Sequence, residues 1–90
     1  MEFEFDSAKN LAHQEKHGIS FEEAQELWDD EEAIQIPAIS ETEERFALLA
    51  LFRSKVWVAF FTYREDTIRL ISVRRARAEE EELYESGRTG

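Results

Sequence analysis

The sequence predicts an α+β fold in which two N-terminal helices pack on an antiparallel β-sheet, in the element order β-α-α-β-β-β-β-α. The prediction rests on helix start and stop residues in the first third, three apolar segments separated by short polar gaps in the second half, and a glutamate-rich stretch near the end. Ninety residues suffice for a single core, so we expect one domain over residues 1–87 and a tail over 88–90. The chain has no cysteine, which excludes disulfides and thiolate metal sites.

The first segment alternates polar and apolar residues over 2–5, which indicates a short strand. Asp6 can cap a helix over residues 7–17, and Gly18 can end that helix. The apolar residues of this helix recur at helical spacing: Ala8, Leu11 and Ala12.

A second helix is predicted over residues 20–30. Ser20 and Glu23 have the spacing of a capping box, in which each side chain binds the backbone N–H of the other residue. The predicted apolar face of this helix consists of Phe21, Ala24, Leu27 and Trp28.

The second half predicts strands and a last helix. Residues 33–37 can form a short strand, which Pro37 confines to the edge of a sheet. Three further strands, joined as hairpins, are predicted over residues 44–52, 56–63 and 67–74. Both faces of the middle strand are apolar, so we expect one face of the sheet to remain exposed for a partner. A helix over residues 78–86 follows, with Gly87 beyond its end.

The charge of the chain is unevenly distributed. The formal net charge is −10, made up of −11 over residues 1–52, +5 over 53–77 and −4 over 78–90. A strongly acidic protein is a poor general binder of nucleic acid, because phosphate is repelled at long range. The N-terminal residues lack the pattern of a signal peptide, and the apolar runs are too short to span a bilayer. We therefore expect a cytoplasmic protein that does not associate with membranes.

Two histidines form the first candidate site. His13 and His17 lie four residues apart on one helix face, a spacing that can hold a metal ion. Their order differs from the His-Glu-x-x-His motif of zinc proteases, and a third ligand is not evident. Partly exposed polar side chains are the favoured interpretation. His17 is also a candidate for acid/base chemistry near neutral pH.

Four arginines near the last strand form the second candidate site: Arg69, Arg74, Arg75 and Arg77. Strand alternation predicts Arg69 and Arg75 on one face and Arg74 on the other, so the four cannot converge on one ligand. They can bind phosphate, or they can pair with the glutamates over residues 79–82, and charge counting alone favours pairing. Tyr84 can either dock the last helix on the sheet or present its hydroxyl near these arginines.

Several ordered segments resemble the signature of the BrnT toxins. In the N-terminal half these are Phe5-Asp6, Lys9, residues 16–24 (KHGISFEEA) and Trp28-Asp29-Asp30. In the C-terminal half they are Glu44-Arg45, Thr62-Tyr63-Arg64, residues 68–72 (IRLIS), Arg74-Arg75-Ala76, and Glu80 with Tyr84. The resemblance covers nearly the whole chain in the right order.

The resemblance implies a bacterial toxin of a type II toxin–antitoxin system with a fold similar to RelE ribonucleases. Such toxins cleave RNA without a metal or other cofactor and thereby arrest growth. A cognate BrnA-like antitoxin, which binds DNA, neutralises the toxin, so the toxin would meet DNA only through this partner. A basic antitoxin would also cover the acidic surface and the apolar sheet face.

The resemblance also implies site residues. The implied catalytic residues are His17, Glu44, Arg64, Arg74 and Tyr84, with His17 or Glu44 as base and Tyr84 or His17 as acid. The implied RNA phosphate-binding residues are Arg64, Arg69, Arg74 and Arg75. Arg77 departs from the family's usual threonine and is therefore the better candidate for pairing with the glutamates.

Other departures from the family's usual residues are His13 for Asn, Ala50 for Gly, Val73 for Ala and Glu31 for Pro. They keep an alternative open, in which the chain is a catalytically weak or inactive module of the toxin fold. Such a module would bind the antitoxin and act as a corepressor.

Overall fold

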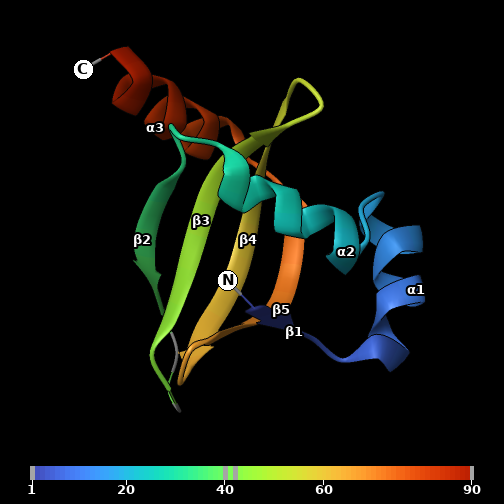
Figure 1. Cartoon of the computed structure of the whole chain (residues 1–90). Helices are drawn as coiled ribbons and strands as arrows, with labels where there is room; N and C mark the ends of the chain where they lie inside the picture. Colours follow the sequence, from blue (N-terminus) through green and yellow to red (C-terminus); the bar gives the residue numbers. More distant parts are fainter. Residues whose placement is uncertain (1, 40, 42, 90) are drawn as a thin grey trace.

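The computed structural model describes residues 2–39, 41 and 43–89 and has an α+β fold. Its elements, in chain order, are strand β1 (Glu2–Glu4), helices α1 (Ser7–His17) and α2 (Phe21–Ala24), the 3₁₀ helix η1 (Gln25–Asp29), strands β2 (Ile34–Ala38), β3 (Arg45–Phe52), β4 (Lys55–Arg64) and β5 (Thr67–Arg75), and helix α3 (Ala78–Thr89). The strands form one five-stranded sheet in the order β1-β5-β4-β3-β2 (Figure 1). In the part of the chain that is described, no helix is long and apolar enough to cross a membrane.

The sheet is mixed, so the prediction of an antiparallel sheet was wrong at one edge. Strands β2 to β5 pair antiparallel, but β1 runs parallel to β5, with Glu2 opposite Thr67 and Glu4 opposite Arg69. The parallel direction lets the chain continue from β1 into α1 along the same edge of β5 (Figure 1). Residue alternation carries no information on strand direction, which is why the sequence did not reveal this pairing.

Helix α1 has the predicted ends but a different inner face. The Asp6 carboxylate accepts from the Ala8 N–H at 3.0 Å, and Gly18 ends the helix in a left-handed conformation with φ of 81°. The predicted apolar positions, Ala8, Leu11 and Ala12, are all exposed. The edge of β5 presents backbone N–H groups, so the side of α1 that faces it carries polar side chains instead.

The capping box at the start of α2 is confirmed. The Ser20 hydroxyl accepts from the Glu23 N–H, and the Glu23 carboxylate accepts from the Ser20 N–H, both at 3.0 Å. The predicted helix over 20–30 is α-helical only through Ala24 and then tightens into η1. Its predicted apolar face packs inward as expected, since Phe21, Ala24 and Leu27 are buried and Trp28 packs against them.

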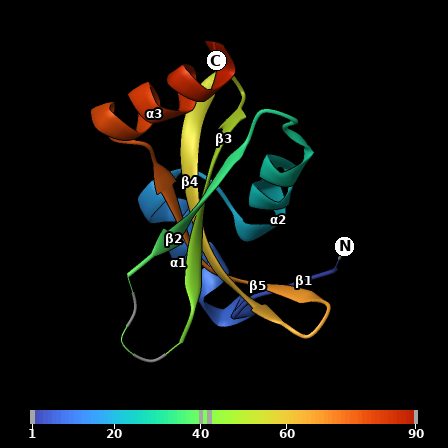
Figure 2. The same ribbon diagram turned by 90° about the vertical axis from the view of Figure 1, so that its left-hand side faces the viewer.

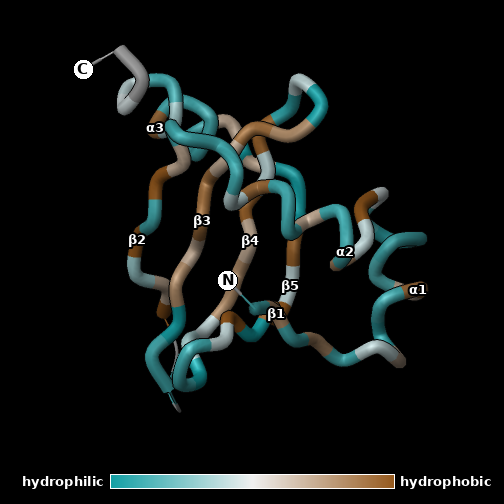
Figure 3. Tube along the Cα trace, in the orientation of Figure 1, coloured by the Kyte–Doolittle hydropathy of each residue, from teal (hydrophilic) through white to brown (hydrophobic). Residues whose placement is uncertain are grey.

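Two apolar clusters cover the two faces of the sheet. Helices α2 and α3 lie on opposite sides of the sheet (Figure 2), and the strands between them are largely hydrophobic (Figure 3). The cluster under α2 includes Trp57, Phe61 and Leu70, whereas Tyr84 of α3 covers Leu49 and other residues on the opposite face. The apolar face that we expected to be exposed is therefore largely covered by α3.

A bulge changes the face on which the arginines of β5 lie. Phe60 pairs with Ser72 and Phe61 pairs with Leu70, so Ile71 has no partner on β4. The extra residue shifts the alternation by one position, and as a result Leu70 and Val73 both lie in the core under α2. Arg69 and Arg74 consequently share the opposite face, although unbroken alternation had predicted different faces for them.

Helix α3 is longer than the predicted helix over 78–86. It continues through Gly87, where a Cβ atom would lie 2.6 Å from Cδ1 of Ile34. Gly87 thus permits a close approach between α3 and β2 and does not end the helix. Of the predicted tail over 88–90, the first two residues belong to α3 and residue 90 lies outside the described residues.

Candidate active site

His17 is the last residue of α1 and is half-buried. The centre of its ring lies 4.7 Å from that of His13, which binds the backbone of Val73 in the C-terminal part of β5. The pKa of its imidazole lies below the ordinary value of 6.5, first because burial disfavours the charged form. Electrostatic interactions with His13, Lys16 and Arg74 lower the pKa further. His17 is therefore neutral at neutral pH and can accept a proton.

Arg74 forms a bidentate ion pair with Glu80 at the start of α3. Its Nη1 and Nη2 lie 2.8 Å and 2.9 Å from the two carboxylate oxygens, and both side chains are less than one-quarter exposed. Nη1 also donates to the Arg75 carbonyl oxygen at 3.1 Å, and the guanidinium lies 5.2 Å from the centre of the Phe60 ring. These hydrogen bonds raise the pKa of Arg74 and lower that of Glu80.

The ion pair leaves one edge of the Arg74 guanidinium unused. Glu80 occupies the end formed by Nη1 and Nη2. Within the described part of the chain, the Nε–H and the second Nη2–H of Arg74 have no hydrogen-bond partner. These two donors form the side-on fork of the guanidinium, which matches two oxygens of a phosphate.

Arg75 and Arg77 flank this pair in different ways. The Arg75 side chain is exposed, and its guanidinium lies 5.5 Å from the centre of the Trp57 ring. Arg77 was the predicted partner of the glutamates, but it contributes its backbone N–H, which donates to Glu80 Oε1 at 2.7 Å. Glu80 thereby fixes the start of α3 as well as Arg74.

His13 holds α1 against the edge of β5. The Val73 N–H donates to His13 Nε2 at 2.9 Å, and His13 Nδ1 lies 3.2 Å from the Ile19 carbonyl oxygen. Because Nε2 accepts, the proton is on Nδ1, which donates to Ile19. The lone pair that a metal would need is thus occupied. Among the described residues, no three His, Asp or Glu side chains are grouped as metal ligands.

Tyr84 is 1% exposed and lies in the core between α3 and the sheet. Its hydroxyl donates to Asp30 Oδ2 at 2.6 Å, and the same oxygen accepts from the Leu51 N–H at 2.9 Å. The hydroxyl thus joins α3 to the loop after η1 and to β3. This geometry gives Tyr84 a structural contact and does not support its predicted role as an acid, which stays a prediction.

Glu44 and Arg64 lie at the other end of the sheet. Glu44 precedes β3, where its carbonyl oxygen accepts from the Thr62 hydroxyl at 2.6 Å, and Arg64 ends β4. Arg74 pairs with Val58, six residues before Arg64 on β4, which separates the two arginines by about 20 Å along the strand. Arg64 and Arg74 therefore cannot bind one phosphate, and the predicted site residues divide into two groups.

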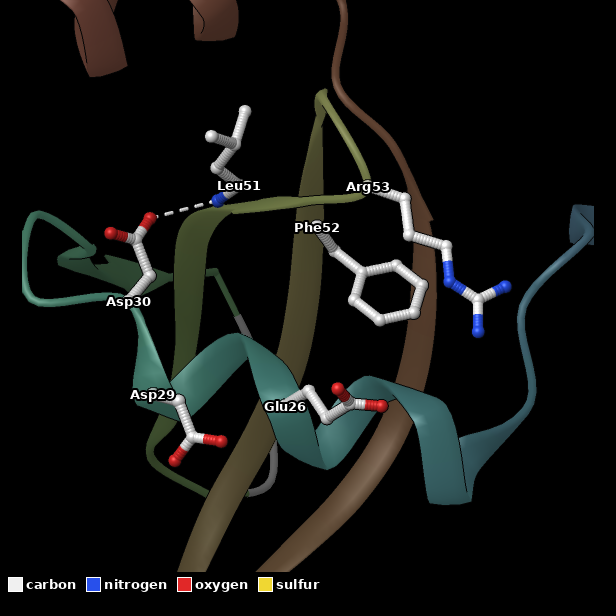
Figure 4. Close-up of a pocket in the computed structure, with 6 residues that line it drawn as sticks. All are labelled: Glu26, Asp29, Asp30, Leu51, Phe52 and Arg53. Carbon is white, nitrogen blue, oxygen red and sulfur yellow. Dashed lines mark hydrogen bonds between the residues drawn. The ribbon is translucent and has the colours of Figure 1, made fainter.

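A solvent-open hollow of about 360 Å³ lies between η1 and the β3–β4 hairpin (Figure 4). It is lined by Glu26, Asp29, Asp30, Leu51, Phe52 and Arg53. Asp30 is the organising residue here, because its carboxylate binds the Leu51 N–H, the Glu32 N–H and the Tyr84 hydroxyl. Asp30 belongs to the Trp28-Asp29-Asp30 segment of the resemblance, but the sequence alone assigned it no role.

Comparison with known proteins identifies the family. No curated protein matches the chain. Residues 5–80 match the family described as "Ribonuclease toxin, BrnT, of type II toxin-antitoxin system". The match includes α1, all of β5 and the beginning of α3, and hence His17, Arg74 and Glu80. The chain therefore belongs to the BrnT family of ribonuclease toxins, which act in type II toxin–antitoxin systems with a protein antitoxin as partner.

Proposed function

We propose that this chain is a RelE-like, metal-independent endoribonuclease whose active site lies at the C-terminal end of β5. The observation that carries the proposal is that His17 lies beside His13, which binds the backbone of Val73, the residue before Arg74. The side-on fork of Arg74 is unused while Glu80 fixes its other end. A base beside an oriented guanidinium is what cleavage of a phosphodiester by its own 2′-hydroxyl requires.

The proposed reaction is a transfer within the RNA strand. His17 accepts the proton of the ribose 2′-hydroxyl as the 2′ oxygen attacks the adjacent phosphorus. The bond from phosphorus to the 5′ oxygen breaks, which leaves a 2′,3′-cyclic phosphate and a 5′-hydroxyl. The buried Tyr84 hydroxyl does not reach solvent in this structure, so protonated His17 is the proposed proton donor to the leaving oxygen.

Arg74 is proposed to stabilise the charge that accumulates on the phosphoryl oxygens. Its Nε–H and the second Nη2–H are two parallel donors that can bind two oxygens of one phosphate. Glu80 limits the rotation of the guanidinium. Arg75 is exposed at the same strand end and is proposed to bind a flanking phosphate. Arg64, Arg69 and Glu44 are too far along the strands to act on that bond, so we assign the two arginines to RNA binding.

The antitoxin is proposed to be a basic, BrnA-like, DNA-binding protein, and toxin residues 1–87 are proposed to form one domain. Support comes from the family, from the formal net charge of −10 and from the acidic hollow in Figure 4. The cytoplasm, where RNA is the target, is the proposed location.

The test is cleavage of a labelled RNA by the purified chain in the presence of a chelator, with expression in a bacterium in parallel. We expect products that end in a 2′,3′-cyclic phosphate and growth arrest that the neighbouring small antitoxin relieves. RNA that stays intact under conditions where a related toxin cuts it, together with normal growth, would overturn the proposal.

A second candidate function is an inactive antitoxin-binding corepressor. The observation in its favour is that Glu80 already neutralises Arg74, in a chain that is strongly acidic overall. Substitution of Arg74 and Arg75 by alanine distinguishes the two functions. Toxicity that is lost while antitoxin binding is retained excludes the corepressor, whereas a harmless wild type that binds its antitoxin supports it.

A further inference from the structure

We propose that Lys9, Arg45 and Arg69 form a second phosphate subsite, which binds a phosphodiester of the RNA strand away from the cleaved bond. This inference rests on the proposed function, since it takes the RNA as the ligand. It adds Lys9 and Arg45 to the RNA-binding residues and gives Arg69 a specific place.

The three cations line one cavity of about 200 Å³. The cavity lies where β1 has ended and α1 begins, beside the bulge of β5, and Leu70 and Ile71 form part of its wall. Pairing between β1 and β5 stops at Arg69, so the backbone leaves an opening at this edge of the sheet. The bulge thus lies in the wall of the cavity, and it also places Arg69 on the face that carries Arg74.

The donors at this cavity are poorly satisfied. Arg45 Nε is buried without a hydrogen-bond partner and lies 3.5 Å from Glu43 Oε1. Arg69 Nη1 lies 3.8 Å from Glu4 Oε1, beyond hydrogen-bond distance. Arg74, by contrast, has two charge-assisted bonds of 2.8 Å and 2.9 Å.

Two carboxylates, Asp6 and Glu43, share the cavity lining with the three cations. Asp6 accepts from the Ala8 N–H as the cap of α1, and Glu43 forms an ion pair with Arg45. The Lys9 ammonium has no ion pair or hydrogen bond with any described residue. An oxyanion in the cavity would supply acceptors for the Lys9 ammonium and for the Arg69 guanidinium.

The position of the cavity favours an RNA strand over a free phosphate ion. Arg69 pairs with Thr62 and Arg74 with Val58, so the two arginines lie about 13 Å apart along β4, on one face of the sheet. A strand of a few nucleotides can span this distance along a basic track. The predicted cleavage site and the cavity would then bind phosphates of the same strand.

The test is binding of an RNA oligonucleotide whose 2′-hydroxyls are methylated, which cannot be cleaved by its own 2′ oxygen. Fluorescence anisotropy at several salt concentrations would compare the wild type with Lys9→Ala and Arg69→Ala. We expect each variant to bind about fivefold more weakly and to lower the slope of log affinity against log salt by about 0.7. Lys55→Ala, at an exposed lysine of the β3–β4 hairpin, is the matched control and should bind like the wild type.

Because the Arg45 Nε is buried, Arg45→Lys is the variant for that position, since it retains the charge and removes the fork. It should weaken binding while leaving the unfolding midpoint close to that of the wild type. Binding unchanged in Lys9→Ala and Arg69→Ala, or a wild type that does not bind the oligonucleotide, would overturn the subsite. Inorganic phosphate that binds the wild type but not Lys9→Ala, with oligonucleotide binding unaffected, would identify a free-anion site and also contradict the inference.

The binding measurement does not require cleavage, so it separates the two proposals. Oligonucleotide binding that depends on Lys9 in a chain that leaves RNA intact would refute the endoribonuclease and keep the subsite. Efficient cleavage by a chain whose oligonucleotide binding does not depend on Lys9 would refute the subsite and keep the endoribonuclease.

Discussion

The arginines at the two ends of β5 differ in how firmly their side chains are held. At the C-terminal end, Arg74 is fixed by a bidentate pair with Glu80 and is less than one-quarter exposed. Toward the beginning, Arg69 makes only a 3.8 Å contact with Glu4, and Arg64 at the adjoining hairpin is exposed. A guanidinium with a fixed orientation can stabilise a transition state, whereas a loosely held one can follow a flexible strand. The proposed function therefore places the chemistry at the C-terminal end and RNA binding toward the beginning of β5.

The largest expected effect of the variants follows from His17→Ala. Loss of the proposed base should lower the RNA cleavage rate by about 10² to 10⁴-fold with little change in stability. Initial rates on one labelled RNA measure the loss, and Lys55→Ala serves as the control. A variant that keeps most of the wild-type rate would remove His17 from the mechanism.

The pH dependence of cleavage gives a second test at the same residue. His17 acts as a base only when neutral, and its pKa lies below 6.5, so activity should be fully present at neutral pH and fall on the acid side of 6.5. Lys16→Ala removes a positive charge that lowers this pKa, and it should therefore shift the acid limb to higher pH. A limb that stays in place or moves to lower pH would contradict the electrostatic account.

Stability should respond next most strongly to His13→Ala. The change removes the acceptor of the Val73 N–H and the donor to the Ile19 carbonyl, at a cost of about 1 to 3 kcal/mol in the free energy of unfolding. Urea unfolding measures the cost. His13→Asn, the usual residue of the family, should lose less because it retains polar groups at this position. Equal stability of the alanine variant and the wild type would show that α1 is not held by His13.

Tyr84→Phe should lower the free energy of unfolding by about 1 to 2 kcal/mol, because Asp30 loses a buried hydroxyl donor. The cleavage rate per folded molecule should stay within about twofold of the wild type. The two quantities together distinguish structure from catalysis. A rate that falls a hundredfold in a variant of normal stability would restore Tyr84 as the acid.

The smallest effect on stability is expected for Glu80→Gln, which removes the charge but keeps the shape. The ion pair with Arg74 is partly exposed, so we expect a loss of about 1 kcal/mol at neutral pH. The folded-state pKa of Glu80 is lowered, so its contribution is present above the ordinary glutamate pKa and is lost as pH falls through the lowered value. The variant should thus approach the wild type in acid. A constant difference down to low pH would show that the ion pair is not its cause.

The local elements could be predicted because short stretches specify them. Asp6, Gly18, Ser20 and Glu23 place the helix ends, and the hydrogen bonds that satisfy those ends involve only neighbouring residues. The direction of β1 and the bulge at Ile71 depend on contacts between distant segments. The polar inner face of α1 has the same origin, since His13 binds a backbone group 60 residues away.

The residues of the candidate site could be named from the sequence, but their arrangement could not. The resemblance includes Arg74, Glu80 and His17; in the structure Arg74 pairs with Glu80, and His17 lies beside His13, which binds β5. The resemblance could not show that Arg74, and not Arg77, pairs with Glu80. Nor could it show that Arg64 and Glu44 lie far from this group. Their distance from Arg74 is set by the length of β4 and by strand pairing, which exist only in the folded sheet.

The most direct test of the central claim compares the RNA cleavage rates of Arg74→Ala and Arg64→Ala. Each variant loses one guanidinium from the same sheet, at ends about 20 Å apart. If the C-terminal end of β5 is the active site, Arg74→Ala should lose about 10² to 10³-fold in rate at saturating RNA. Arg64→Ala should lose less than about threefold. A large loss in Arg64→Ala beside a nearly normal Arg74→Ala would place the chemistry at the opposite end of the sheet and contradict the account.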